Sequence, residues 1–503
     1  MLHPKNKNYF SCSGTRKSQL IPAIFVIAGI FVTSLDQTFV VTVLPQIMWD
    51  FRLPTNQLDH AAWIVTGYFI GYVVSIPLMA RIADTHGHFR VLRAALVVCS
   101  LGTISAALST DINWLIGSRV LQAIGSGTLL PIGMTVVSRP ITAQRKWIAI
   151  GVIAAVTELG LVMGPIYGGF IDSVLGWRWL FILQVPIIAI VIGGLLRIKD
   201  PPLTRSPINY QGGVLLAITL TLITATLSQR DLFFSMSQVV IYLSLASLVA
   251  LSLFTYSQLR SSNPLLPNTL FKSKFIVAAF AIKLLMGTGL IIGLLTVPLM
   301  ANTIFGLTAF QGGLLLLRLT GALPFGAILG GYLVKRFGPR IVVAIGLILG
   351  STGLWLMSRW GTEVPSLWDS SDLIIVGLGF GLVITPIFAT VLDFTPEPNQ
   401  ATAAGLVTIS RMIGMCFGLA AFSAWGMESF TALTQNLALP IPLLGETQET
   451  LDARILSYQQ GILYAGISVF QSFLALGAFI TAIALIPASL LPSRGTGIRT
   501  HTR

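Results

Sequence analysis

The chain has 503 residues, of which 54% are hydrophobic and only 10% are charged, and its mean hydropathy is +0.83. A soluble domain carries about 25% Asp, Glu, Lys and Arg, so this composition excludes a water-soluble enzyme, a disordered scaffold and a nucleic-acid-binding protein. The formal charge of +13 would indicate an acidic partner only if the cations formed one soluble face. The composition therefore predicts an all-α integral membrane protein with several spans.

Hydropathy along the chain predicts fourteen transmembrane helices, because the apolar stretches reach the ~20 residues that cross a bilayer. The predicted spans are 20–48, 61–81, 92–110, 113–138, 147–172, 177–197, 211–229, 236–258, 275–302, 308–334, 340–358, 371–393, 401–426 and 461–490. The basic segment before the first span resembles the start of a signal peptide, but the span itself is too long for one. We therefore expect it to remain as the first helix.

The positions of Lys and Arg predict the orientation of the chain. With the N-terminus inside, 22 of these residues fall on inside segments and five on outside loops. Cytoplasmic loops carry an excess of Lys and Arg, so both termini are predicted to be cytoplasmic in a multi-pass protein of the cell (inner) membrane. Four further cations lie within the predicted spans: Arg119, Lys283, Arg318 and Arg411.

An internal repeat predicts two six-helix bundles. The basic, glycine-containing turns at 81–93 and 331–340 take equivalent places if the seventh and eighth helices are an insertion. The predicted parts are a cytoplasmic tail at 1–19, a first bundle at 20–197, a linker with two inserted helices at 198–258, a second bundle at 259–490 and a tail at 491–503. The longest outside loop, about 427–460, carries four acids and one Arg and is expected to hold a short amphipathic hairpin.

Cofactor chemistry finds no support in the sequence. The three cysteines, Cys12, Cys99 and Cys416, form no metal or thiol-redox pattern. There is no Walker motif and no nucleophile–base constellation. We therefore expect no cofactor, no metal and no enzymatic activity, and transport driven by an ion gradient.

Four segments in chain order resemble motifs of the major facilitator superfamily. They are the first-helix acidic motif at Leu35–Ile47, the loop motif at Arg81–Arg90, the fourth-helix motif at Leu115–Gly127 and the fifth-helix antiporter motif at Gly160–Gly169. The stretch Gly176–Pro186 is similar to the sixth helix of the fourteen-helix drug:proton antiporters of the EmrB/QacA type, and 377–387 and 410–418 resemble matching stretches of the second half. The resemblance covers about residues 20–490 and implies a major facilitator fold.

The loop motif implies a conformational latch. Gly87 turns the chain, while Asp84 and Arg90 are expected to pair with charges at neighbouring helix ends in one conformation only. His88 and Phe89 stand where the family has basic residues, so this latch is expected to be weaker or to use other partners.

The antiporter motif predicts a bent and closely packed fifth helix. Its residues are Gly160, Gly164, Pro165, Gly168 and Gly169. The proline has no backbone N–H to donate, and the four glycines have no side chains. The alternative is a set of glycines that serve packing alone. The resemblance associates the motif with antiport and hence with export.

Charged residues inside a membrane are costly and therefore suggest function. Asp36 and Glu158 are expected to carry protons or to pair with substrate, and the alternative is a structural ion pair of one of them with Arg119. Arg119 and Gln122, three residues apart on the same helix face, are expected to belong to the same proton-coupling or substrate site, where Arg119 stays charged and modulates its neighbours.

The second half carries cations where the first carries anions. Lys283, Arg318 and Arg411 are expected either to coordinate an anionic or zwitterionic substrate or to neutralise the carboxylates across a central cavity. For Lys283 the alternative is a side chain that reaches back to the membrane surface.

These features together predict proton-coupled export of amphipathic small molecules by alternating access, as in multidrug efflux. A dedicated exporter of one metabolite, siderophore or lipid is the alternative, and a membrane sensor or scaffold without transport is a further one. The expected partners are an amphipathic small-molecule substrate, the coupling ion and the lipid bilayer. The coupling ion is expected to be the proton, with sodium as the alternative. An accessory envelope protein is left open.

Overall fold

The computed structural model describes residues 16–54, 57–138, 146–196, 198, 209–232, 237–261, 264–266, 269–363, 371–395, 400–442 and 447–493. The predicted tails up to residue 15 and from residue 494, and most of the predicted linker around 199–208, lie outside these ranges. Within them all regular structure is helical.

The first part of the chain forms nine helices that account for the first six predicted spans. They are α1 (Arg16–Thr42), α2 (Leu44–Asp50), α3 (Leu58–His86), α4 (His88–Ala107), α5 (Ile112–Ser126), α6 (Leu129–Ser138), α7 (Lys146–Leu175), α8 (Arg178–Ile182) and α9 (Gln184–Leu195). The span predicted at 20–48 is divided at Val43, because Pro45 in the first turn of α2 has no N–H with which to continue the ladder of α1.

The remaining chain supplies the inserted pair and the last six spans. Its elements are α10 (Tyr210–Leu227), η3 (Arg230–Leu232), α11 (Gln238–Arg260), η4 (Leu270–Lys272), α12 (Lys274–Thr303), α13 (Ala309–Phe337), α14 (Pro339–Met357), α15 (Ser371–Asp393), α16 (Gln400–Thr434), α17 (Gln448–Ile483) and α18 (Leu485–Ala488). We call α1–α9 the first group and α12–α18 the second group.

The described residues hold 13 helical segments that are long and apolar enough to cross a membrane. The 30-residue α7 adds another crossing, since it runs beside α1 in the same direction: Gly160 packs on Phe31 and Ser34, and Gly168 packs on Phe39. The predicted all-helical fold of fourteen spans is thereby confirmed.

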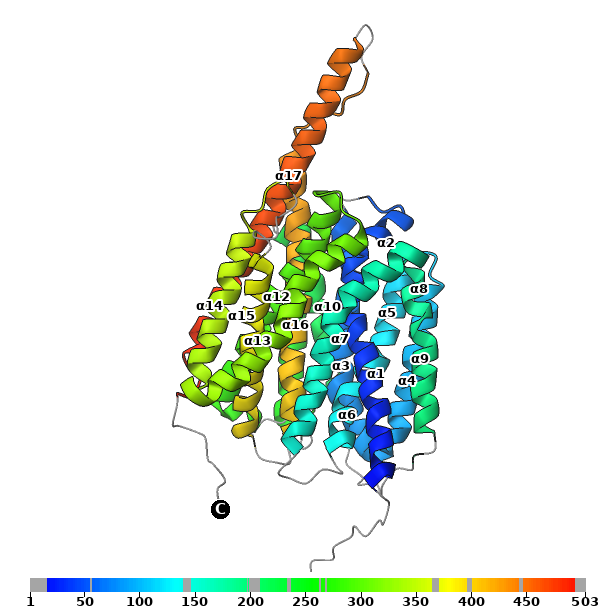
Figure 1. Cartoon of the computed structure of the whole chain (residues 1–503), viewed down its shortest axis with the longest axis vertical. Coiled ribbons are helices and arrows are strands. Elements are labelled where there is room, and N and C mark those ends of the chain that lie inside the picture. The colour runs from blue at the N-terminus through cyan, green and yellow to red at the C-terminus, as the bar shows by residue number, and fades with distance from the viewer. Residues whose placement is uncertain are drawn as a thin grey trace, which may run out of the picture.

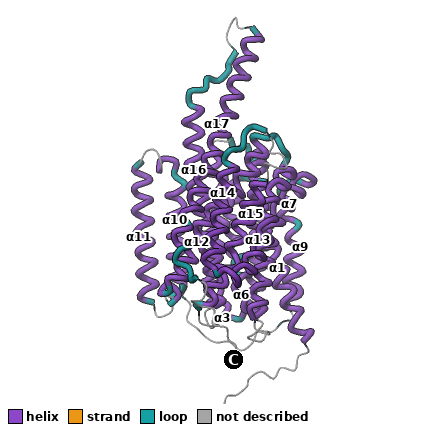
Figure 2. The backbone as a smooth tube through the Cα atoms, turned by 60° about the vertical axis from the view of Figure 1, so that its left-hand side comes forward, coloured by secondary structure: helices purple, strands orange, loops and turns teal. Residues whose placement is uncertain are grey.

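Two seams join the two groups. At one seam α7 packs on α13, and at the other α3 packs on α16. Helix α10 packs on both α3 and α16 and so covers the second seam, while α11 stands outside α10 at the edge of the bundle (Figure 2). The seam between α7 and α13 has no inserted helix over it.

Helix α17 continues far beyond the other helices, and the end of α16 with the non-helical segment 435–442 forms the second arm of this projecting hairpin (Figure 1). It leaves the face of the bundle opposite to the start of α1. Helix α16 has 35 residues, about 52 Å at 1.5 Å per residue, against a hydrocarbon core of about 30 Å. The short hairpin expected at 427–460 is thus built largely from extensions of the two membrane helices themselves.

Candidate functional site

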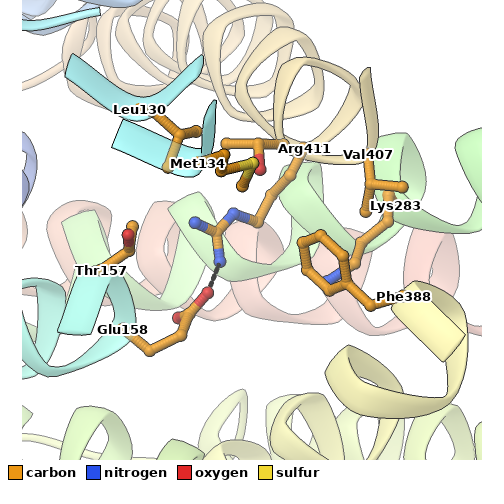
Figure 3. Close-up of a pocket in the computed structure, with 9 residues that line it drawn as sticks. Leu130, Met134, Thr157, Glu158, Lys283, Phe388, Val407 and Arg411 are labelled. Carbon is orange, nitrogen blue, oxygen red and sulfur yellow. Dashed lines mark hydrogen bonds and ion pairs between the residues drawn. The ribbon is translucent and has the colours of Figure 1, made fainter. Parts of the chain in front are cut away.

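A small pocket, called the central pocket below, lies where the two groups meet (Figure 3). Its walls come from α6, α7, α12, α15 and α16, through Leu130, Met134, Thr157, Glu158, Lys283, Phe388, Val407, Thr408 and Arg411. The space for water-sized molecules inside it is about 10 Å³, close to the need of one water molecule. The structure is therefore closed at this pocket, and a cargo that binds here requires the groups to separate.

One ion pair crosses this pocket from group to group. Arg411 Nη1 of α16 lies 2.6 Å from Glu158 Oε1 of α7, and both side chains are buried. In the described part of the chain, Glu158 Oε2 and Arg411 Nε have no hydrogen-bond partner. Two charges taken out of water are stabilised only while they remain together, so this pair favours the state in which α7 and α16 are close.

Lys283 of α12 lies in the same pocket and is only 1% exposed. Its Nζ lies 5.5 Å from the centre of the Phe388 ring, and no ion pair joins it to another described residue. Lys283 therefore does not reach back to the membrane surface. Arg318 is half-buried on α13 and is not among the residues that line the pocket.

A second buried ion pair lies wholly inside the first group. Arg119 Nη1 of α5 donates to Asp36 Oδ1 at 3.1 Å, and Nη2 donates to the Asp36 carbonyl oxygen at 2.9 Å. Gln184 Nε2 of α9 donates to the same carboxylate oxygen at 3.2 Å. Asp36 Oδ2 accepts no hydrogen bond from the described residues. Of the two pairings left open for Arg119, the structure has the one with Asp36.

Further contacts of Arg119 connect this ion pair to its surroundings. Its Nη1 also donates to Gln122 Oε1 at 2.5 Å, as expected for residues three apart on one helix face, and Gln122 Nε2 donates to Thr103 at 2.9 Å. The Tyr68 ring lies 4.1 Å from the guanidinium carbon. Thr103 was not found from the sequence, and Tyr68 was a candidate for a cavity that the sequence alone could not place. The signal for Gln184 was its place two residues before the proline of the sixth-helix motif.

The glycines of the antiporter motif let α7 touch both of its neighbours. A Cβ at Gly164 would collide with the Thr38 hydroxyl of α1, and a Cβ at Gly169 would lie 2.7 Å from the Ala309 carbonyl oxygen of α13. Pro165 has no N–H to donate to the Leu161 carbonyl four residues earlier. Thr38 Oγ1 donates to that carbonyl at 2.9 Å and so satisfies it from the neighbouring helix.

Replacing Thr38 with Val is expected to lower the free energy of unfolding, because it removes a hydrogen bond between α1 and α7. The substitution keeps the shape but leaves the buried Leu161 carbonyl without its donor, at a cost of about 1 kcal/mol. Thermal unfolding of the purified protein measures the effect. The matched control is Thr303→Val, because that hydroxyl donates within its own helix to Leu299. Equal unfolding temperatures for the two variants would contradict this account.

The loop motif is placed at the junction of α3 and α4. Gly87 has φ of 104°, a conformation that suits glycine, and ends α3 while starting α4. Asp84 Oδ1 lies 3.4 Å from His88 Nε2. His88 is one of the two residues that stand where the family has basic residues. Arg90 is exposed on the same face. The latch itself stays a prediction.

Comparison with known proteins decides the family. Residues 26–419 match the Major Facilitator Superfamily, which is more than half of the chain. The chain belongs to the Major Facilitator Superfamily. This facilitator is therefore a multi-pass membrane transporter and not an enzyme.

Two relatives of this facilitator are both described as triacylglyceride transporters. The triacylglyceride transporter of Mycolicibacterium hassiacum is 31% identical over 482 residues, covering 89% of this chain and 90% of that protein. The triacylglyceride transporter of Mycobacterium tuberculosis is 30% identical over 497 residues, covering 94% of each chain.

A solved structure supports the same fold. The bacterial homologue of the human lysosomal transporter Spinster, in an inward-facing and occupied conformation, matches this facilitator with a TM-score of 0.63. The match has 16% sequence identity and covers 95% of this chain and 97% of that one. At this identity the likeness concerns the fold alone.

Proposed function

We propose that this facilitator exports an acyl lipid by proton-coupled alternating access. The relatives described as triacylglyceride transporters support a lipid as cargo, since they align with nearly the whole chain. The cation distribution supports cytoplasmic termini, so that the hairpin of α16 and α17 faces outward. The two bundles are taken as 20–197 and 259–490.

The observation that carries the proposal is the buried pair of Glu158 and Arg411 between the groups. A cargo can enter the pocket only if α7 and α16 move apart, and this separates the pair. Protonation of Glu158 removes the charge that holds Arg411 and so lowers the cost of opening. Proton binding at Glu158 and opening of the pocket are thereby coupled.

The uncovered seam between α7 and α13 supports entry of a lipid from the side. Pro165 lies against Gly313 there, and the rings of Phe170 and Phe310 meet edge to face at 6.1 Å. Phe170 is 52% exposed, so this contact lies at the lipid-facing surface of the seam. A long apolar molecule could pass here without leaving the hydrocarbon, whereas α10 covers the opposite seam.

The test is transport by the purified protein in proteoliposomes. With an imposed pH gradient, we expect movement of a fluorescent acylglycerol between the leaflets and counter-movement of protons, both abolished when the gradient is collapsed. Protein-free vesicles are the control. Lipid movement that ignores the pH gradient would refute proton coupling, and replacement of the pH gradient by a sodium gradient tests the alternative ion.

Multidrug efflux is the second candidate, and the antiporter motif and the sixth-helix stretch that resemble the drug:proton antiporters favour it. A panel of unrelated cationic dyes in the same proteoliposomes separates the two. Extrusion of several dyes supports multidrug efflux, and extrusion of none supports a dedicated lipid exporter. Absence of substrate-dependent proton movement for every compound would favour a non-transporting sensor.

A further inference from the structure

We propose that the central pocket is a binding site for a single anionic headgroup, a carboxylate or a phosphate diester, held between Lys283 and Arg411. This inference rests on the proposed function and narrows its cargo to acyl lipids that carry one negative charge. The triacylglycerides named for the relatives carry none.

The charges of the pocket do not balance. Its lining contains one carboxylate, Glu158, and two cations, Lys283 and Arg411. The pair of Asp36 and Arg119 is neutral as a unit and lies inside the first group. Asp393, the remaining carboxylate near Phe388 on α15, is exposed and outside the lining. The pocket therefore holds one more basic than acidic side chain, in a setting where an unpaired charge is costly.

The position of Lys283 makes it the unpaired member. Glu158 is engaged with Arg411, while Lys283 projects into the pocket beside the Phe388 ring (Figure 3). An ammonium near an aromatic face is stabilised only weakly compared with an ion pair. One anion placed between Lys283 and Arg411 would satisfy both the ammonium and the unused Arg411 Nε donor.

The other walls of the pocket fit the chain of such a lipid. Leu130, Met134 and Val407 are apolar and surround the charged residues from α6 and α16. In the closed state Glu158 occupies the carboxylate position on Arg411, so opening exposes a guanidinium and an ammonium together. A headgroup with one negative charge then offsets positive charge between Lys283 and Arg411, and an uncharged glyceride does not.

The test compares lipid binding by the full chain in detergent micelles for the wild type, Lys283→Gln and Lys283→Arg. Lys274→Gln is the matched control, because it removes an exposed lysine from the same helix. The probes are oleate for the carboxylate, dioleoylphosphatidylglycerol for the phosphate and diolein as the uncharged lipid. Affinity is measured by the rise in unfolding temperature with lipid concentration.

We expect Lys283→Gln to weaken binding of at least one anionic probe by about 10- to 100-fold, the range for loss of a charged hydrogen bond. Diolein binding should be unchanged, Lys283→Arg should stay within a few-fold of the wild type and Lys274→Gln should match it. The anionic probe that responds identifies the headgroup. Because Lys283→Gln removes an unpaired buried charge, the variant is expected to fold at least as stably as the wild type.

Two results would overturn the inference: anionic binding that is the same with and without Lys283, or an equal loss for diolein, which would give Lys283 a purely structural role. Failure of the proposed function is a separate result. If no lipid moves in proteoliposomes while anion binding depends on Lys283, the site stands and the export proposal falls. If glycerides move and Lys283 has no effect, only the headgroup site falls.

Discussion

Replacing Arg411 with Met should reduce pH-driven transport to below about 1% of the wild-type rate, a loss of more than ~2.7 kcal/mol in the barrier. The same variant should be destabilised by about 3–5 kcal/mol, because it leaves Glu158 buried without a counter-charge. Proton-driven uptake in proteoliposomes and thermal unfolding measure the two effects.

The double variant Glu158→Met, Arg411→Met separates function from stability. Apolar side chains of similar volume replace a buried ion pair at little or no cost, so this protein should unfold near the wild-type temperature. It should still fail to transport, since no titratable carboxylate remains between the groups. A double variant that regains pH-driven transport would show that the pair only serves stability.

The control is the ion pair of Arg230 and Asp59, which joins η3 to the start of α3 at 2.7 Å and is partly exposed. Neutralising both residues as Asp59→Asn, Arg230→Gln should change stability by less than about 1 kcal/mol, as is usual for exposed pairs. Transport should remain near the wild-type rate, because this pair lies outside the pocket.

Replacing Asp36 with Asn should abolish transport driven by a pH gradient while leaving exchange of substrate between the two sides of the membrane. The amide keeps the size of the side chain and an acceptor for Arg119, but it cannot carry a proton. A carboxyl that couples protons to cargo is needed for net driven transport and not for exchange. Counterflow in proteoliposomes measures exchange, and an imposed pH gradient measures coupling.

A structural role for Asp36 gives a different result. If the carboxylate serves only to neutralise Arg119 inside the first group, Asp36→Asn should lower the unfolding temperature and both modes of transport together. The companion variant Asp36→Asn, Arg119→Gln should then recover stability. Unchanged pH-driven transport by Asp36→Asn would remove Asp36 from the mechanism altogether.

Hydropathy alone predicted the ends of most of the membrane helices to within a few residues. The predicted span 371–393 coincides with α15, and 275–302 differs from α12 by one residue at each end. The extent of the α16–α17 hairpin was not predictable in this way, because a helix that leaves the membrane loses its apolar signal while its backbone continues unchanged. The break at Val43 also lies within continuous apolar sequence.

The charged residues were identified from the sequence, but their partners were only partly assigned. The spacing of Arg119 and Gln122 fixes a contact within one helix, and the structure has it. The contact of Glu158 with Arg411 joins residues 253 apart and depends on how the two groups pack, which no local pattern encodes. For the same reason the sequence could not show that Asp36 lies outside the central pocket while Lys283 lies inside it.

Arg411 and Thr434, where α16 ends within the projection, belong to one unbroken helix. About 23 residues separate them, a lever arm of roughly 35 Å at 1.5 Å per residue. If α16 tilts by about 10° when the ion pair of Arg411 with Glu158 on α7 breaks, the end of α16 at Thr434 moves by about 6 Å, by the same helix geometry. Protonation of one side chain would thus displace the projecting end of α16 by several ångströms, enough to change its contacts with a molecule beyond the bilayer.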